Sequence, residues 1–253
     1  MSFTSTPNPD IRIGRVAFHV DRPLDEGRSH TIPRPLPNRT FFMVCAGRPG
    51  SGKTTLVVNL LTKRGKLYNR IFDWVFLVSP STGSLESDPF GTLPESHRWS
   101  TFEPSTCDEV DAMLAELPTA ETKLLILDDV MASFKDSAYV QKAFLRWTAN
   151  RRHLRLSIIA TTQVYNKIPR PVRAQISHVA LYPTANRSEL DTLYKELEIM
   201  ERTRFGELMR WVFSHGKHSF AFVNLDSPKV YRMFDEIRMP CAAGPAEGAA
   251  APV

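Results

Sequence analysis

Long apolar runs are missing from this sequence. No stretch of about 18 consecutive apolar residues, the length that crosses a bilayer, occurs among its 253 residues. The first residues, MSFTSTPNPDIRIGR, also lack the apolar segment of a secretory signal. We therefore expect a soluble, intracellular protein with no membrane insertion.

Cysteine is scarce as well. The three cysteines, Cys45, Cys107 and Cys241, lie far apart and form no C-x-x-C pair. That spacing does not indicate a zinc site or a dithiol redox centre, and it fits a reducing compartment best. No repeat of fixed period is visible, which excludes a repeat array.

The composition is that of one globular domain. A chain of 253 residues with 42% hydrophobic content can bury one sizeable α/β core. Its formal net charge of +5 and pI of about 9.2 favour polyanionic partners such as nucleic acid without establishing one.

Both ends differ in composition from the centre. Residues 1–38 contain six prolines and are expected to form an arm, because proline resists both helix and central strand. Residues 241–253 are almost wholly Ala, Gly and Pro, and we expect a disordered tail. Residues 39–240 then form the folded domain, with a long loop or small insertion at 80–105.

Within that domain, short apolar runs alternate with helical patterns, as in βαβ units built on a mostly parallel sheet. The predicted strands are residues 41–46, 74–79, 124–127, 157–162 and 178–181. The predicted helices are residues 53–63, 107–117, 138–150, 189–197 and 200–213. Segments 220–224 and 230–234 flank an Asp-Ser-Pro turn and predict an antiparallel hairpin. Capping-box patterns place helix starts at Thr106 with Glu109 and at Ser188 with Asp191.

One motif indicates phosphate binding. The segment GRPGSGKTT matches G-x-x-x-x-G-K-T directly after a predicted strand and at the start of a predicted helix. Glycines let such a loop turn its backbone N–H groups towards phosphate oxygens, and the helix directs its positive end at the same anion. Lys53 would reach the β- and γ-phosphates and Thr54 would ligate Mg²⁺. The predicted ATP-binding residues are Gly47, Arg48, Pro49, Gly50, Ser51, Gly52, Lys53, Thr54 and Thr55.

A second motif ends the apolar strand KLLILDD. Asp128 would hold the Mg²⁺ shell together with Thr54, and Asp129 would polarise the attacking water. The alternative for such an acidic pair is a helix cap. A basic cluster, NRRHLR, precedes the next strand and offers Arg152 as the first candidate for an arginine finger acting on a neighbouring subunit. Arg151 of the same cluster and Arg173, farther along the chain, are the further candidates. A solvated loop or a DNA-backbone contact is the other interpretation of any one of these arginines.

Taken in order, the segments GRPGSGKTT, LLILDDV, NRRHLRLSIIATTQ and IPRPVRAQISH resemble the genome-packaging ATPases of poxviruses and nucleocytoplasmic large DNA viruses, within the FtsK/HerA superfamily. The resemblance is strong over residues 40–182. It implies a RecA-like P-loop core with strand order 5-1-4-3-2 and a catalytic role for Lys53, Asp129, Gln163 and Arg152. Gln163 would face the γ-phosphate and sense hydrolysis. Asp129 departs from the Glu that many members of the wider superfamily have there.

The same resemblance implies the partners. They are double-stranded DNA, capsid or portal-vertex proteins, and further copies of the chain in a hexameric or pentameric ring. The expected location is the host cytoplasm, in the virus factory, and the virion.

Four other classes compete with this interpretation. A GTPase is disfavoured because Asn166-Lys-Ile-Pro169 lacks the carboxylate that pairs with guanine. A P-loop kinase would want an arginine-rich lid. A helicase or AAA-type ATPase shares the core, but no helical lid domain follows. A nucleotide-binding scaffold without hydrolysis is the fourth, and it is disfavoured by the intact Lys53 and acidic pair.

Overall fold

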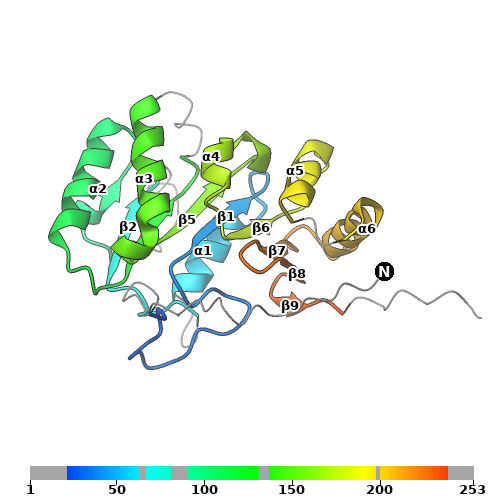
Figure 1. The fold of residues 1–253 in the computed structure, drawn as a ribbon, viewed down its shortest axis with the longest axis horizontal. Helices are drawn as coiled ribbons and strands as arrows, with labels where there is room; N and C mark the ends of the chain where they lie inside the picture. Colours follow the sequence, from blue (N-terminus) through cyan, green and yellow to red (C-terminus); the bar gives the residue numbers. More distant parts are fainter. Residues whose placement is uncertain (1–21, 63–66, 81–89, 131–136, 198–199, 239–253) are drawn as a thin grey trace, which may run out of the picture.

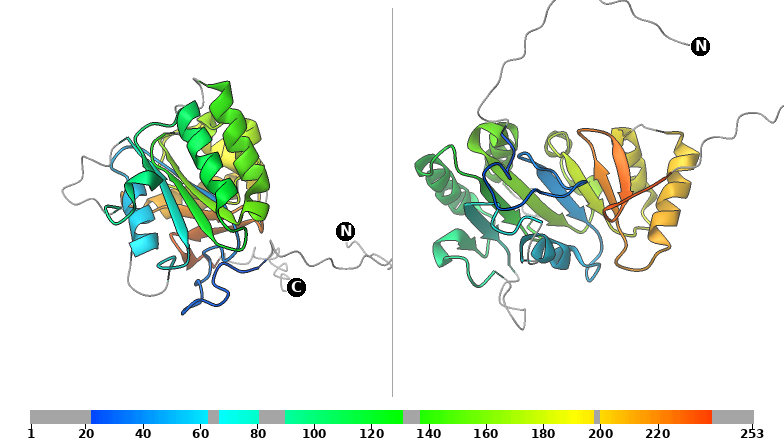
Figure 2. Two further views of the ribbon diagram at one scale, coloured as in Figure 1. Left: turned by 90° about the vertical axis from the view of Figure 1, so that its left-hand side faces the viewer. Right: turned by 90° about the horizontal axis from the view of Figure 1, so that it is seen from below.

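The computed structural model describes residues 22–62, 67–80, 90–130, 137–197 and 200–238. One nine-stranded sheet runs through them, in the order β3-β2-β4-β5-β1-β6-β7-β8-β9. Helices lie on both faces of this sheet, as Figures 1 and 2 show. The predicted α/β class is therefore confirmed. The predicted tail, residues 241–253, lies outside the described residues.

The elements of the described chain alternate along most of its length. The strands are β1 (Phe42–Ala46), β2 (Trp74–Val78), β3 (Arg98–Trp99), β4 (Lys123–Leu127), β5 (Leu156–Thr162), β6 (His178–Leu181), β7 (Ala221–Asn224), β8 (Lys229–Arg232) and β9 (Asp235–Glu236). The α-helices are α1 (Lys53–Thr62), α2 (Pro104–Glu116), α3 (Ala138–Leu154), α4 (Arg170–Arg173), α5 (Arg187–Leu197) and α6 (Arg202–Phe213). Single turns of 3₁₀ helix, Glu95–His97 and Tyr165–Lys167, complete the set.

The centre of the sheet has the strand order that the resemblance implied. In the described sheet β1 lies between β5 and β6, β5 also pairs with β4, and β4 pairs with β2, all in parallel. Counting only the five predicted strands, this is the order 5-1-4-3-2. The predicted hairpin is also confirmed, since β7 pairs antiparallel with both β6 and β8 at one side. The carboxyl ends of β1, β4 and β5 consequently meet at one edge of the sheet.

Two apolar layers enclose the sheet, and β1 shows how the sequence divides between them. Phe42, Val44 and Ala46 contact the layer that contains α2 to α6, whereas Met43 and Cys45 contact the layer that contains α1. Successive side chains of a strand point to opposite faces, so a strand covered on both faces is apolar or small along most of its length. This explains the continuous apolar runs of the sequence.

Two predicted helix starts were wrong. Helix α2 begins at Pro104 after Glu103, and Thr106, already inside the helix, donates its hydroxyl to the Thr101 carbonyl at 2.9 Å. Proline is favoured in a first turn because its missing N–H has no partner to lose there. At α5 the Asn186 side chain accepts from the Ser188 N–H at 3.0 Å, so Ser188 does not cap it.

Short elements were not predicted. The edge strand β3 and the turn Glu95–His97 lie in the segment expected to be a loop or small insertion, and α4 follows β5. Strands of two residues and helices of four carry too little periodicity to be recognised in a sequence.

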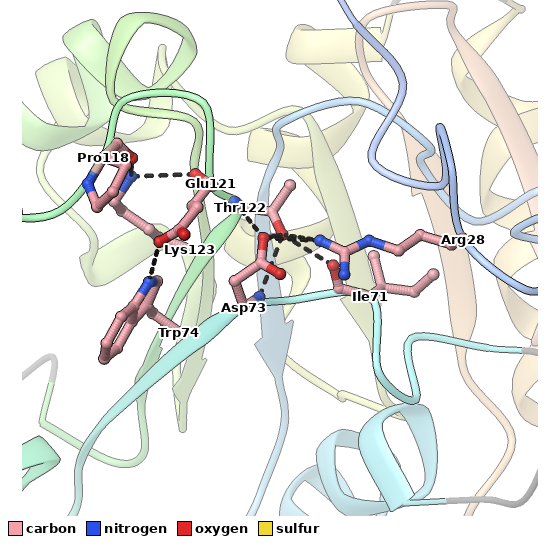
Figure 3. A network of polar contacts seen from close by, with 8 residues as sticks. All are labelled: Arg28, Ile71, Asp73, Trp74, Pro118, Glu121, Thr122 and Lys123. Carbon is pink, nitrogen blue, oxygen red and sulfur yellow. Dashed lines mark hydrogen bonds and ion pairs between the residues drawn. The ribbon is translucent and has the colours of Figure 1, made fainter.

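The segment just before β1 packs on the α1 side of the sheet. Leu24, Ile32 and Leu36 are buried there. Figure 3 shows how Arg28 fixes this segment to the amino edge of the sheet: its guanidinium donates to Asp73 at 2.6 Å, and the Thr122 N–H donates to the same carboxylate at 2.9 Å. These hydrogen bonds outweigh burial and lower the pKa of Asp73.

None of the helices within the described ranges has both the length and the apolar character needed to span a bilayer.

Candidate nucleotide-binding site

The predicted phosphate loop connects β1 to α1 at the carboxyl edge of the sheet. A Cβ atom added to Gly47 would lie 2.6 Å from the Tyr182 Cβ, so only glycine fits there. Gly50 and Gly52 have φ angles of 68° and 106°, which other residues adopt only with strain. The loop therefore has the backbone that its sequence predicts, and helix α1 directs its first N–H groups into it.

Lys53 is the central cation of this loop. Its ammonium is mostly buried and donates to the carbonyl oxygens of Gly47 at 2.7 Å and Arg48 at 3.2 Å. Burial lowers the pKa of Lys53, while the carboxylates of Asp129 and Asp128 act in the opposite direction. The group thus lies between the loop and the acidic pair, as the sequence predicted.

The remaining loop residues differ in exposure. Ser51 is buried, and within the described structure its hydroxyl has no hydrogen-bond partner. Arg48, Pro49, Gly50 and Thr55 are exposed along the rim. A loop with an unpaired inner hydroxyl, obligatory glycines and a buried ammonium fits an anionic ligand such as a triphosphate.

Asp128 lies directly opposite the start of α1. The Thr54 hydroxyl is 3.3 Å from its Oδ1, and the Thr161 hydroxyl donates to the same oxygen at 2.8 Å. Ser79 lies 3.5 Å from the other oxygen. One carboxylate and one hydroxyl are the protein ligands that Mg²⁺ combines with phosphate oxygens and water, so Thr54 and Asp128 fit the predicted metal pair.

Asp129 is exposed and has a strained backbone. Its φ angle is 56°, and its N–H donates to the Thr161 hydroxyl at 2.9 Å. Asp tolerates this left-handed conformation better than most residues. Asp129 also lines a cavity of about 390 Å³, which is large enough to hold water.

Gln163 reaches the same acid from the neighbouring strand. Its side-chain amide donates to Asp129 Oδ2 at 3.3 Å. The prediction depended on β5 lying between the loop strand β1 and the acidic strand β4, which is the observed order. The structure therefore brings Lys53, Thr54, Asp128, Asp129 and Gln163 together.

Sequence reasoning missed two groups that organise this site. Thr161 bridges the two acids, donating to one side chain and accepting from the backbone of the other. Tyr182 packs against Gly47 and donates its hydroxyl to the Gly52 carbonyl at 3.0 Å. Both residues lie at or directly after the carboxyl end of a central strand, and a polar residue at that position is the sequence signal that could have identified them.

The first-choice arginine lies away from this cluster of site residues. Arg152 is near the end of α3, just before the amino end of β5, whereas Gln163 follows the carboxyl end of this 7-residue strand. At about 3.3 Å per residue the two ends are roughly 20 Å apart. Arg152 therefore lies at the opposite edge from the phosphate loop of its own chain.

Of the other two arginines, Arg173 joins separate segments of the chain, whereas Arg151 bonds within its own helix. The Arg173 guanidinium donates to Glu196 at 2.9 Å and to the carbonyls of Ile168 at 2.7 Å and Asn166 at 3.1 Å. Arg151 donates to the Thr148 carbonyl at 2.9 Å, and burial lowers its pKa. The Arg173 guanidinium is thus engaged within the chain, whereas the buried Arg151 Nε has no hydrogen-bond partner among the described residues.

Solved structures with this fold exist. The genome packaging NTPase B204 from Sulfolobus turreted icosahedral virus 2, in complex with ATP-gammaS, is 14% identical, with a TM-score of 0.52 over 78% of this chain and 98% of that one. Its complex with AMPPCP gives 16% identity and a TM-score of 0.54 over 79% and 99%. Strand order, glycine loop and acidic strand end together give the chain the fold of the P-loop NTPases, with a RecA-like core.

Within this class the chain resembles a particular viral family, as its sequence predicted. Residues 106–220 match the family described as Poxvirus A32 protein. Uncharacterized protein 015R of Frog virus 3 (isolate Goorha) is 26% identical over 159 residues, which are 60% of this chain and 47% of that protein. The chain thus spans about half the length of this curated relative.

Proposed function

We propose that this protein is an ATP-hydrolysing motor that moves double-stranded DNA into a viral capsid. The observation that supports this most directly is the convergence of the phosphate loop, the acidic pair and Gln163 at one edge of the sheet. The resemblance to the poxvirus A32 family and to a genome packaging NTPase supports DNA as the substrate that is moved.

In this proposal the loop residues 47–55 bind ATP, and a bound Mg²⁺ would supply neutralisation of phosphate charge. Lys53 contacts the phosphates. Thr54 and Asp128 would hold the metal, and the 3.3 Å separation of the Thr54 hydroxyl from Asp128 Oδ1 supports that pairing. Asp129 accepts a proton from the attacking water, and Gln163, hydrogen-bonded to it, orients that water and senses the loss of the γ-phosphate.

Arg152 is proposed to act on the neighbouring subunit. It lies at the amino edge of the sheet, so contact with a phosphate site requires a second copy of the chain. A ring of five or six subunits would supply one such arginine to each site. Stabilisation of phosphoryl charge by an arginine in trans is a recurrent device of such NTPases.

The proposed cargo and location rest on the resemblance to viral packaging proteins. Double-stranded DNA would bind through basic surface, and the net charge of +5 supports a polyanionic cargo. Capsid or portal-vertex proteins would receive the motor in the host cytoplasm, at the virus factory. A helicase or AAA-type ATPase remains the second candidate, because it shares the core and the coupling to nucleic acid.

The decisive experiment measures phosphate release by the full chain with and without double-stranded DNA. We expect DNA to raise the rate, and Lys53→Ala to abolish ATP binding or turnover because the central ammonium is lost. Lys195→Ala, at an exposed position on α5, is the matched control and should retain activity. Unchanged hydrolysis in Lys53→Ala would refute the phosphate-loop assignment, whereas strand separation without duplex movement would favour a helicase.

A further inference from the structure

A short turn between α6 and β7 lies against the phosphate loop, far from it in sequence. The Ser219 N–H donates to the Gly216 carbonyl at 3.1 Å, which makes Lys217 and His218 the two central residues of a turn. Gly216 has a φ angle of 109°, a conformation that glycine adopts without strain. The Ser219 hydroxyl donates to the Val212 carbonyl at 2.9 Å and fixes the turn to the end of α6.

His218 binds the turn to the loop. Its Nδ1 lies 2.9 Å from the carbonyl oxygen of Ser51, and a Cβ added to Gly52 would lie 3.3 Å from the same nitrogen. A carbonyl oxygen can only accept, so Nδ1 must carry the proton of this hydrogen bond. The contact joins residues 167 positions apart in the chain.

Residues that flank the neighbouring strands β6 and β7 also support the contact between turn and loop. Phe220, directly after the turn, packs against Tyr182 with ring centroids 5.2 Å apart. The Tyr182 hydroxyl in turn donates to the Gly52 carbonyl. The turn and the loop are therefore attached to each other through β6 and β7 as well as directly.

This attachment places a second ammonium at the loop. A Cβ added to Gly50 would lie 3.8 Å from the Lys217 Nζ. Lys217 is exposed, and no carboxylate of the described chain forms an ion pair with it. A lysine has a flexible four-carbon stem and three donors, so an ammonium at this position can reach an oxygen of a phosphate held by the loop.

We infer that Lys217 is a nucleotide-binding residue that contacts the phosphates beside Gly50, on a turn that His218 fixes to the loop. The inference rests on the proposed nucleotide binding. The phosphate site would then include the turn that precedes the antiparallel strand β7, in addition to the phosphate loop and the acidic end of β4.

The test is titration of the full chain with a fluorescent ATPγS analogue and Mg²⁺. A charge-assisted hydrogen bond at a solvent-accessible site predicts about a tenfold loss of affinity for Lys217→Gln. Lys217→Arg keeps the charge and should stay close to wild type. Lys195→Gln removes an equally exposed lysine from α5 and should have no effect.

Three results would overturn the inference, and they are distinguishable. If the wild-type chain binds the analogue and Lys217→Gln binds it equally well, the assignment of Lys217 is wrong and nucleotide binding stands. If the wild-type chain itself does not bind, the proposed function fails as well. A loss of equal size in Lys195→Gln would show a general charge effect and would also overturn the assignment.

Discussion

Buried His178 makes the stability of this fold sensitive to mild acid. The side chain begins β6, is only 4% exposed, and stacks on Phe222 with ring centroids 5.6 Å apart. Its Nδ1 lies 2.9 Å from the Ser177 hydroxyl. Burial, and secondarily the positive charge of Arg151, lowers the pKa of His178 from 6.5 to about 4.

The direction of the effect follows from proton linkage. The folded chain keeps His178 neutral down to about pH 4, whereas the unfolded chain protonates it below 6.5. Acid therefore favours the unfolded state throughout this window, and stability is recovered as the pH rises above 6.5. A shift of this size costs about 2 kcal/mol of unfolding free energy at pH ~5 and about 3 kcal/mol once the folded chain is also protonated.

Urea unfolding measures this cost directly. We would compare the unfolding free energies of wild type and His178→Gln at about pH 7.5 and about pH 5. Glutamine does not titrate but can still hydrogen-bond Ser177, so the variant should lose about 2 kcal/mol less than wild type between the two conditions. Any loss of unfolding free energy that the substitution causes equally at both pH values cancels in this comparison.

His153→Gln is the matched control. His153 is exposed near the end of α3, so this variant measures what replacing an exposed histidine by glutamine does by itself. The reasoning is refuted if His178→Gln and wild type lose equal stability on acidification, because the proton uptake would then arise at other groups.

Two further predictions concern catalysis. Asp129→Asn should still bind ATPγS, since the loop and Lys53 are intact, but single-turnover hydrolysis should fall by on the order of 10² or more because the general base is lost; normal turnover would assign that role to another residue. Mixing Arg152→Ala with Lys53→Ala should restore part of the ATPase activity if each phosphate site takes its arginine from a neighbour. Absence of rescue would remove Arg152 from the shared site and leave a contact to DNA as its role.

Local sequence was sufficient to predict the phosphate loop, the central strands and the acidic pair. The phosphate loop could be predicted because it depends on glycine conformations and on a strand and a helix that are adjacent in the chain. The central strands could be predicted because each is buried on both faces, and the acidic pair because it follows such a strand directly. The strand order came from the resemblance, since alternation alone permits several.

Contacts between distant segments could not be predicted in the same way. Thr161 bridges the two acids only because β5 lies beside β4 in the observed register. His218 meets Ser51, and Arg28 meets Asp73, across long stretches of chain. No periodicity or spacing encodes such pairs, because they depend on how whole elements pack.

The arginines show the same division. The basic run before β5 was visible in the sequence, but its position at the edge opposite the phosphate loop required the direction of β5 in the folded sheet. Residue types and local backbone conformation thus account for what each segment can bind. Which segments share a site is set by packing, because side-chain chemistry acts over a few ångströms and only the folded chain brings remote residues that close.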